Sequence, residues 1–399
     1  MSSESRRSTA DTNEHEREQW FHGFLPREDI NRLLTEDGQF LVRVTEPQPG
    51  MGLKTVLSSR WHGKNHHFVI IEHNGKVLIE GMEFLSILQM VQYYIREQKP
   101  LTQSTGALLI MPIPRQRWEL RHESIALGHL LAEGAFGGVY AGVLTIGLKK
   151  YPVAVKVNKG NKLTKQAVKE ICKEARIMRR YRHPNVVKFY GVAAEREPLM
   201  LVMELVDGGA LDVYLQKTKS DTTIVERIRF AFGAAKGLEY LHKNECIHRD
   251  VAARNCLVNN GDVKLGDFGL SRELSNRVKK YTIKDENQRL PVRWLAPEVL
   301  SSATYSTKSD VFSYGILLWE IFSDAAMPYG DMTLAEVIAQ VQAGHRLSAP
   351  DTMPKFLRSI MKEHCFPASP EDRSTMEEIR SIIEDLMEKR VSSRYEEKN

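Results

Sequence analysis

Short apolar runs of strand-like pattern alternate with helical patterns and divide the 399-residue chain into two ordered regions. The first region predicts a helix from about Pro26, several strands and a second helix over Phe84–Arg96. The strands are expected at Phe40–Val44, Thr55–Ser59, Phe68–Ile71 and Val77–Ile79, with a hairpin turn at Asn74-Gly75 between the last two. This order of elements predicts a small α+β domain.

The second region begins with strands and continues mostly as helices. Strands are expected within about Ile125–Val143, at 151–157 and at Leu199–Leu205, a helix over Thr164–Tyr181, and mainly helices from about Leu211. Residues 1–19 have mixed charge and no apolar period, which predicts a disordered tail. We therefore expect a tail at 1–19, a first domain at 20–112, a linker at 113–118, a second domain at 119–390 and a C-terminal tail at 391–399.

Composition and charge exclude several classes of protein. Lys and Arg total 56 against 51 Asp and Glu, and a net charge of +5 over this length argues against a dedicated nucleic-acid binder. The four cysteines form no C-x-x-C pair, which predicts reduced and mostly buried thiols in a cytosolic protein. The N-terminus lacks an apolar signal region and a myristoylation motif, and the apolar runs are too short to span a bilayer. A cytoplasmic location is therefore expected.

The run Phe40-Leu41-Val42-Arg43 is the first chemically informative feature. On a strand, Leu41 and Arg43 share one face, while Phe40 and Val42 share the other. An arginine beside Leu41 is partly buried, and a buried guanidinium needs an anionic partner. The alternative is an arginine at a strand end that reaches water, which is the usual fate of a lone arginine. The histidines 62, 66 and 67 have no thiol or paired carboxylate near them, so a metal site is not expected.

The surrounding residues favour the anion-binding interpretation. Trp20-Phe21-His22-Gly23, then Arg27, the FLVR run and His67-Phe68 resemble the Src-homology 2 (SH2) family over about Trp20 to Pro112. The resemblance implies a central antiparallel sheet flanked by two helices, and bidentate binding of phosphotyrosine by Arg43. Arg27, Thr45 and His67 match positions that assist it. The planar guanidinium suits this task because it pairs with two phosphate oxygens.

The second region carries an ordered set of short motifs. They are the glycine-rich segment 131–139, Val153-Ala154-Val155-Lys156, the segment HRDVAARN at 248–255, Asp267-Phe268-Gly269 and Ala296-Pro297-Glu298. Their order and spacing resemble the bilobal protein-kinase fold over about residues 119–390. The glycine-rich segment departs from the family pattern, since Ala132 replaces its first glycine while Gly134 and Gly137 fill the other two places.

The kinase resemblance implies ATP and Mg²⁺ as cofactors. Lys156 is expected to hold the ATP phosphates, with Glu174 orienting it from a helix; Glu170 is the competing candidate, and the motif KEARIM favours Glu174. Met203 falls at the gatekeeper place before the hinge. The full expected nucleotide-binding set is Leu131, Gly134, Gly137, Val139, Ala154, Lys156, Met203 and Glu204.

The loop around Asp250 is implied to perform the chemistry. Asp250 is expected to position the substrate hydroxyl and accept its proton, while Asn255 and Asp267 coordinate Mg²⁺. Ala252-Ala253-Arg254 resembles the form found in tyrosine kinases, and the segment 291–294 (PVRW) resembles their substrate platform. Tyrosine is therefore the expected acceptor, with Arg254 and Pro291 shaping the site.

Four further residues have implied roles in the same region. Tyr281 is either an exposed loop tyrosine or an autophosphorylation site whose phosphate pairs with Arg249. Asp310 matches the residue that braces the catalytic loop, and Arg373 matches the arginine that pairs with Glu298.

An SH2 domain joined by a short linker to a tyrosine kinase resembles the Fes/Fer non-receptor tyrosine kinases, in a short form like the Fer-like kinases of nematodes. The segments WFHGFLPREDI, EARIM, VMELVDGG and HRDVAARNCLV carry this resemblance. The long N-terminal membrane-binding coiled-coil region of that family does not occur in this sequence, so curvature sensing is not expected.

Two hypotheses about function follow. The first is an active tyrosine kinase that phosphotyrosine proteins recruit, to the plasma membrane or cell junctions, and stimulate; the intact catalytic residues favour it. The second is a phosphotyrosine-binding scaffold with a weak kinase fold, and Ala132 favours it. The short linker predicts that the SH2 domain rests on the kinase small lobe, so that phosphopeptide binding stabilises the position of Glu174.

Overall fold

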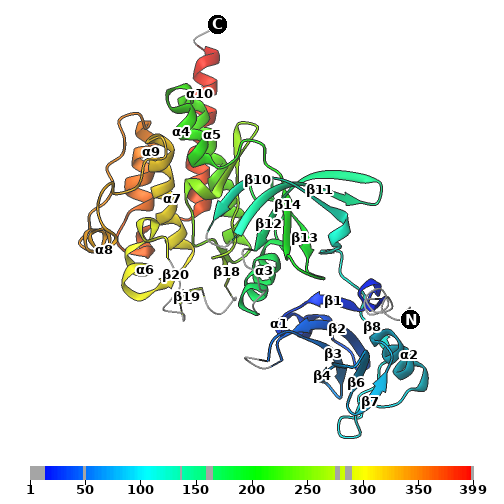
Figure 1. The fold of residues 1–399 in the computed structure, drawn as a ribbon. Coiled ribbons are helices and arrows are strands. Elements are labelled where there is room, and N and C mark those ends of the chain that lie inside the picture. The colour runs from blue at the N-terminus through cyan, green and yellow to red at the C-terminus, as the bar shows by residue number, and fades with distance from the viewer. Residues whose placement is uncertain are drawn as a thin grey trace. The chain divides into compact units, whose positions relative to one another are not determined.

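The computed structural model describes residues 14–47, 51–134, 137–158, 165–274, 279–283 and 290–396. By its internal contacts the chain divides into two units, one of residues 1–175 and 189–205 and the other of residues 176–188 and 206–399. The first unit holds the two larger sheets, and the second is mainly helical (Figure 1). The linker at 113–118 lies inside the first unit.

The N-terminal part of the first unit is a sheet with one helix on each face. Its strands run in the order β1-β2-β3-β4, and β8 also pairs with β2. The bounds are β1 (Phe21–Phe24), β2 (Gln39–Thr45), β3 (Lys54–Trp61), β4 (Lys64–Val69), β8 (Met111–Pro112), α1 (Arg27–Leu33) and α2 (Ile87–Glu97). This architecture confirms the expected SH2 fold, with β2, β3 and β4 antiparallel to one another.

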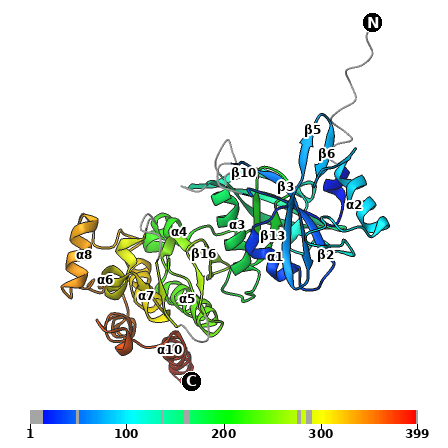
Figure 2. The same cartoon turned by 90° about the horizontal axis from the view of Figure 1, so that it is seen from below.

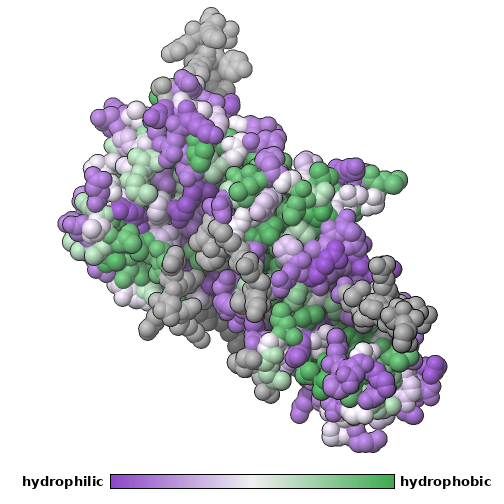
Figure 3. Space-filling model, viewed as in Figure 1, coloured by the Kyte–Doolittle hydropathy of each residue, from purple (hydrophilic) through white to green (hydrophobic). Residues whose placement is uncertain are grey.

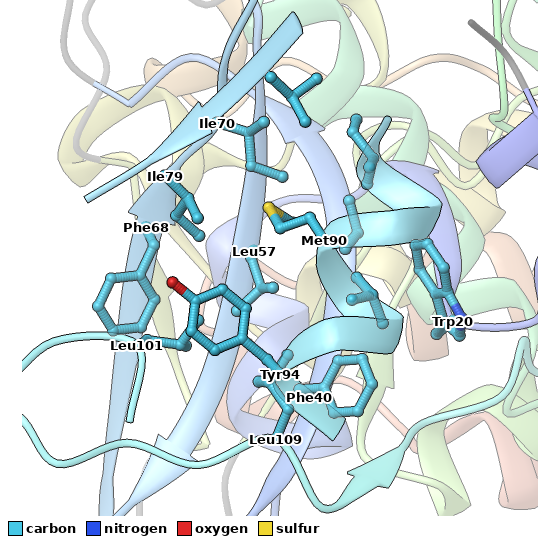
Figure 4. Packing of buried hydrophobic residues seen from close by; sticks show 14 of the residues in the cluster. Trp20, Phe40, Leu57, Phe68, Ile70, Ile79, Met90, Tyr94, Leu101 and Leu109 are labelled. Atoms are coloured by element: carbon cyan, nitrogen blue, oxygen red, sulfur yellow. The ribbon is translucent and has the colours of Figure 1, made fainter. Parts of the chain in front are cut away.

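Side chains along β2 point alternately to the two faces of the sheet, and each face packs against a different helix. Phe40 and Val42 belong to the core that includes Met90 and Tyr94 of α2 (Figure 4). Leu41 belongs to the opposite core with Ile30 of α1. Because side chains alternate along a strand, Arg43 follows Leu41 on the α1 face. The predicted division of this strand into two faces is therefore confirmed.

The structure corrects two element boundaries in this part. The helix predicted over Phe84–Arg96 begins at Ile87, because Ser86 caps it by accepting a hydrogen bond from the backbone N–H of Gln89. The strand predicted at Phe68–Ile71 is divided, and its second half forms a separate three-stranded sheet of β5 (Ile71–His73), β6 (Lys76–Ile79) and β7 (Met82–Phe84). The Asn74-Gly75 hairpin is confirmed, with φ values of 49° and 73°.

The second sheet of the first unit has six strands in the order β10-β11-β12-β14-β13-β9. Its elements are β9 (Glu119–Leu120), β10 (Ile125–Gly134), β11 (Gly137–Ile146), β12 (Lys149–Asn158), α3 (Lys165–Met178), β13 (Phe189–Ala193) and β14 (Met200–Glu204). Val153, Val155 and Val202 form part of its core. The hairpin tip between β11 and β12 is apolar and exposed, as the green surface in Figure 3 shows, and Leu148 is fully solvent-accessible there.

The second unit is built around α7. Its helices are α4 (Leu211–Thr218), α5 (Ile224–Lys243), α6 (Pro297–Ser302), α7 (Thr307–Phe322), α8 (Leu334–Gln342), α9 (Lys355–Ser359) and α10 (Met376–Glu396). Short strand pairs join β15 (Cys246–Ile247) to β18 (Arg272–Glu273), β16 (Cys256–Asn259) to β17 (Asp262–Leu265), and β19 (Tyr281–Thr282) to β20 (Thr304–Tyr305). Both Figure 1 and Figure 2 place α7 between α5 on one side and α6 and α8 on the other.

Two predictions about the ends of the chain need correction. Residues 391–396, predicted as a tail, continue α10. Residues 14–19 were included in the disordered tail, yet Glu14–Arg17 forms a 3₁₀ helix in which His15 is buried. The His15 ring packs edge-on against Phe21 at 5.0 Å, and Arg115 and Arg121 donate to the carbonyl of Glu16 at 2.9 and 3.2 Å. These contacts hold the short polar segment in place.

All four cysteines are buried and none forms a disulfide, as expected. Within the described ranges, no helix combines the length and the apolar character that crossing a membrane requires.

Glu195 ties the segment after the SH2 sheet to the second sheet of the same unit. Its carboxylate accepts hydrogen bonds from Arg115, from Arg121 at 3.1 Å and from the backbone N–H of His122 at 3.1 Å. The side chain is only 5% exposed. Burial opposes ionisation, but the hydrogen bonds from His122 and the charges of Arg115 and Arg121 lower the pKa of Glu195 to about 2. The linker is therefore anchored rather than free.

This arrangement predicts a pH-dependent loss of stability. The folded pKa of Glu195 lies below the usual unfolded value of about 4.3, so its stabilisation is present above that pH and disappears as the pH falls towards 2. We expect Glu195→Gln to lower the free energy of unfolding by about 2 kcal/mol at pH 7, and by about half as much at pH 3, which lies between the two pKa values. Urea denaturation at both pH values measures this, with Glu72→Gln on the exposed strand β5 as control. An equal loss at both pH values would contradict the assignment.

Candidate functional site

Arg43 is buried in the SH2 sheet, and the partners found for its guanidinium are neutral. Its Nε donates to the hydroxyl of Ser58 at 3.1 Å, and its Nη1 donates to the carbonyl of Leu25 at 2.8 Å. The residue is only 2% exposed. A hydroxyl and a carbonyl orient a guanidinium without neutralising its charge, and the favourable charge of Glu28 is a smaller effect than burial and the charge of Arg27.

The neighbours of Arg43 add to this positive potential. Burial, followed by the charge of Arg27 at the start of α1, lowers the pKa of Arg43 to about 10. Burial and then the charges of Arg43 and Arg27 lower the pKa of His67 to about 4, so its imidazole is neutral at pH 7. Three predicted residues thus meet in one place, and the repulsion between the charges of Arg43 and Arg27 favours an anion there.

Ser58 is a member of this group that the sequence did not single out. It lies on β3 opposite both Leu41 and His67, and its hydroxyl contacts His67 Nδ1 at 3.0 Å as well as Arg43. The signal that could have found it is cross-strand register, which short sequence motifs do not contain. Thr45 lies two residues beyond Arg43 on β2 and therefore on the same face.

In the second sheet of the same unit, Lys156 and Glu174 form an ion pair. The Lys156 ammonium lies 3.0 and 2.9 Å from the two carboxylate oxygens of Glu174. Glu174 on α3 is 5% exposed, so this pair is shielded from water. Glu170, the competing candidate, is exposed and accepts a hydrogen bond from Gln166 instead. The structure therefore brings Lys156 together with Glu174 and not with Glu170.

The other residues of the expected nucleotide set lie on the strands around Lys156. Val139 is opposite Lys156 across β11 and β12, and Ala154 is opposite Met203 across β12 and β14. The register of β10 against β11 shifts between Leu130 and Ala132, so Leu131 is the extra residue of a bulge. The remaining members are Gly134, which pairs with Gly137 at the end of that hairpin, and Glu204, which ends β14. The loop between the two glycines, 135–136, lies outside the described residues.

In the second unit, α7 holds the loop that carries Asp250. Asp310 accepts hydrogen bonds from the backbone N–H groups of His248 at 2.7 Å and Arg249 at 2.9 Å. Arg249 and Asp267 both have left-handed backbone, with φ values of 70° and 51°. Such conformations cost energy, and they persist at functional sites because neighbouring contacts enforce them.

Asp250 is bonded to the arginine that follows it in the same loop. Arg254 donates to one carboxylate oxygen of Asp250, and its guanidinium stacks over the Trp294 ring at 4.2 Å. Burial raises the pKa of Asp250, an effect that the charges of Arg254 and His248 oppose. A carboxylate held in place by a cation and raised in pKa is suited to accept a proton.

Asn255 and Asp267 offer oxygen atoms of the kind that a hard divalent cation requires. The amide nitrogen of Asn255 donates to the carbonyl of Asp250 at 2.8 Å, which leaves its amide oxygen as the atom available to a cation. Asp267 is exposed, and the backbone N–H of Gly269 donates to its carboxylate at 3.2 Å. A carboxylate and an amide oxygen fit Mg²⁺, which binds through few protein ligands.

Tyr281 contacts Arg249 through its ring. The Arg249 guanidinium lies 4.8 Å from the Tyr281 ring centroid and 4.1 Å from that of Tyr305. Tyr281 and Tyr305 face each other across the two short strands β19 and β20. Arg272 also approaches the Tyr281 ring, at 5.3 Å. Tyr281 and Arg249 are thus adjacent, and Tyr305 and Arg272 lie beside them.

One other predicted pair and one predicted single residue lie in the second unit. Arg373 binds the carboxylate of Glu298 in a bidentate manner, with both distances 2.8 Å. Pro291 precedes the short 3₁₀ turn Val292–Trp294 that carries the tryptophan. Sequence reasoning missed Glu320, whose only signal is a charge within an apolar helix.

Comparison with known proteins agrees with both parts of this geometry. Residues 125–383 match the family described as protein tyrosine and serine/threonine kinase, and residues 20–94 match the SH2 domain family. Fer-related kinase 1 of Caenorhabditis elegans is 36% identical over 379 residues, which cover 93% of this chain and 94% of that protein. The chain belongs to the Fer/Fps family of tyrosine-protein kinases.

The Fer/Fps relatives differ in length. Mouse tyrosine-protein kinase Fer is 40% identical over 356 residues, which cover 89% of this chain but 42% of Fer. Spermatocyte protein spe-8 of C. elegans is 35% identical over 375 residues, which cover 92% of this chain and 71% of that protein. The chain therefore spans less than half the length of mouse Fer. The resemblance to the Fes/Fer kinases, and to a short nematode form in particular, is confirmed.

Proposed function

We propose that this protein is a non-receptor tyrosine kinase that transfers the γ-phosphate of ATP to protein tyrosine. The observation that carries the proposal is the Asp250 carboxylate, fixed by Arg254 and raised in pKa by burial. Asp250 accepts the proton of the tyrosine hydroxyl while Arg254 keeps its carboxylate oriented. Arg254 and Pro291 shape the place of the tyrosine ring.

On the first unit, Lys156 is assigned to the phosphates of ATP. Its ion pair with Glu174 holds the ammonium in one position, which lowers the cost of ordering a flexible lysine on binding. Leu131, Val139, Ala154, Met203 and Glu204 are assigned to the adenine side, and Gly134 and Gly137 to the phosphates.

Asn255 and Asp267 are assigned to Mg²⁺. When bound, this ion neutralises charge that builds on the phosphates during transfer. The hydrogen bond from Asn255 to the carbonyl of Asp250 keeps this ligand next to the catalytic carboxylate.

The first sheet is assigned to phosphotyrosine, with Arg43 as the main ligand and Arg27, Thr45 and His67 beside it. The supporting observation is a buried guanidinium whose identified partners are neutral, next to His67, whose pKa is lowered by burial and then by the charge of Arg43. A phosphate of nearly two negative charges compensates this potential. Phosphotyrosine proteins are then the partners, and recruitment to the plasma membrane or cell junctions follows from where they are displayed.

Tyr281 is assigned as the autophosphorylation site and Arg249 as the partner of its phosphate. The ring already lies over the guanidinium, so the added phosphate is generated beside a cation. Tyr305 and Arg272 complete the surroundings of this tyrosine.

We further assign a coupling between phosphopeptide binding and Glu174. Phe24 of β1 donates its N–H to the carbonyl of Ala194 at 2.6 Å, and its own carbonyl accepts from the Cys172 thiol at 3.8 Å. Cys172 stands on α3, two residues before Glu174. If phosphopeptide binding to the SH2 sheet orders β1, the contact between Phe24 and Cys172 transmits this order to α3, the helix that carries Glu174.

The first prediction concerns phosphoryl transfer itself. Asp250→Asn and Lys156→Met are each expected to lower tyrosine phosphorylation at least about 100-fold, because each removes a group that acts on the reacting atoms. Phosphate incorporation into a tyrosine peptide measures this, with Lys150→Met on the same strand and Asp385→Asn on α10 as controls. Chelation with EDTA is expected to stop the reaction and Mg²⁺ to restore it. Wild-type activity no higher than that of the two variants would favour the scaffold hypothesis.

The second prediction concerns the SH2 sheet. Arg43→Lys is expected to weaken binding of a phosphotyrosine peptide at least roughly tenfold, because an ammonium cannot pair with two oxygens at once. Ser58→Ala is expected to weaken it by about threefold to tenfold, since one orienting hydrogen bond is lost. Calorimetry with phosphotyrosine and unphosphorylated peptides provides the measurement.

The proposed coupling predicts that saturating phosphopeptide raises the catalytic rate of wild type but not of Arg43→Lys. Equal catalytic rates of wild type with and without the phosphopeptide would argue against the coupling.

The third prediction concerns Tyr281. Tyr281→Phe preserves the ring over Arg249 but removes the hydroxyl, so autophosphorylation and the activation that follows it are expected to be lost. Basal activity before autophosphorylation is expected to stay near that of wild type. Mass spectrometry and a time course of activity after adding ATP measure both. Unchanged phosphate content and activity would refute the assignment.

A further inference from the structure

Glu320, near the end of α7, is a buried carboxylate that joins two separate segments of the second unit. It is 4% exposed and follows an apolar stretch of the helix. Its Oε2 accepts a hydrogen bond from the backbone N–H of Ala253 at 2.9 Å and another from the indole N–H of Trp294 at 3.0 Å. One oxygen atom thus fixes both the loop that contains Asp250 and the segment that contains Trp294.

The indole N–H and the ring face of Trp294 contact two different residues. The indole N–H is directed to Glu320, while the ring face lies 4.2 Å from the Arg254 guanidinium. Arg254 in turn donates to Asp250. A chain of direct contacts therefore runs from Glu320 through Trp294 and Arg254 to the carboxylate assigned as the proton acceptor.

One further contact fixes the backbone of the same segment. The Ser313 hydroxyl on α7 donates to the carbonyl of Trp294 at 2.7 Å. Ser313 holds the backbone carbonyl of Trp294, so the hydrogen bond from the indole N–H to Glu320 sets the rotation of the ring. The ring orientation then determines where Arg254 can stack.

We propose that Glu320 and Trp294 are positioning residues for the peptide substrate. By bonding to both segments, Glu320 sets the distance between the substrate platform around Trp294 and the loop with Asp250 and Arg254. The residues assigned to ATP in the first unit do not take part in these contacts. We therefore expect a loss of these contacts to weaken binding of the peptide substrate and not of ATP. This inference rests on the proposed tyrosine-kinase function and assigns the control of its peptide site.

The electrostatics of Glu320 agree with this role. Burial raises its pKa to about 7, and the hydrogen bonds from Trp294 and Ala253 and the charge of Arg254 oppose that rise, while the charge of Asp212 adds to it. A carboxylate is costly to bury, and these donors are what make its ionised form tolerable. The two segments cannot separate without leaving buried polar groups unpaired.

The decisive variant is Trp294→Phe, which removes the indole N–H but retains an aromatic ring for Arg254. We expect the KM for a tyrosine peptide to rise about threefold to tenfold, with a smaller change in kcat and a KM for ATP within about twofold of wild type. The matched control is Trp319→Phe on α7, next to Glu320 in the chain, which loses an indole hydrogen bond to the carbonyl of Ser348 instead. It is expected to leave both KM values unchanged.

Variants of Glu320 supply a second test. Glu320→Gln keeps an oxygen that accepts both hydrogen bonds and is expected to lie between wild type and Glu320→Ala in peptide KM. If Trp294→Phe lowers the melting temperature but leaves the peptide KM unchanged, Glu320 and Trp294 are only structural and the inference is wrong. An inactive wild-type protein overturns the proposed function instead, so the two failures are distinguishable.

Discussion

A loop that carries catalytic groups exposes backbone N–H groups which need acceptors, and in this protein α7 provides them from two buried carboxylates. Asp310 accepts from His248 and Arg249, and Glu320 accepts from Ala253. A buried N–H without an acceptor costs about 1–3 kcal/mol, so these contacts determine the path of the loop. The positions of Asp250 and Arg254 follow from that path.

Glu195 and Arg43 are two buried charges of the first unit, and they differ in the charge of the groups around them. Glu195 is surrounded by Arg115, Arg121 and the N–H of His122, which lower its pKa to about 2, so its charge is compensated within the unit. Arg43 is oriented by a hydroxyl and a carbonyl, and its pKa is lowered to about 10. A charge that the fold compensates stabilises the fold, whereas one that the fold only orients is suited to an external ligand.

Much of the architecture followed from patterns within the chain. Alternation in Phe40–Arg43 predicted the two faces of β2, and Asn74-Gly75 predicted its hairpin, because strand geometry and positive φ are local properties. Local patterns failed where a distant contact decides the outcome. Residues 14–19 are polar and looked disordered, but a ring of one of them packs on Phe21. Glu320 was not singled out, because its partners Ala253 and Trp294 are distant in sequence.

The sequence by itself determined the family, the order of the two folds and the identity of the charged groups, since these depend on residue type and spacing. It placed Glu174 ahead of Glu170 only through a motif; the tertiary structure distinguishes them by the distance to Lys156. Only the tertiary structure decided that Ser58 meets Arg43 and that Trp294 meets Glu320. Register across strands and packing between helices bring such pairs together, and neither is a property of any one segment of the chain.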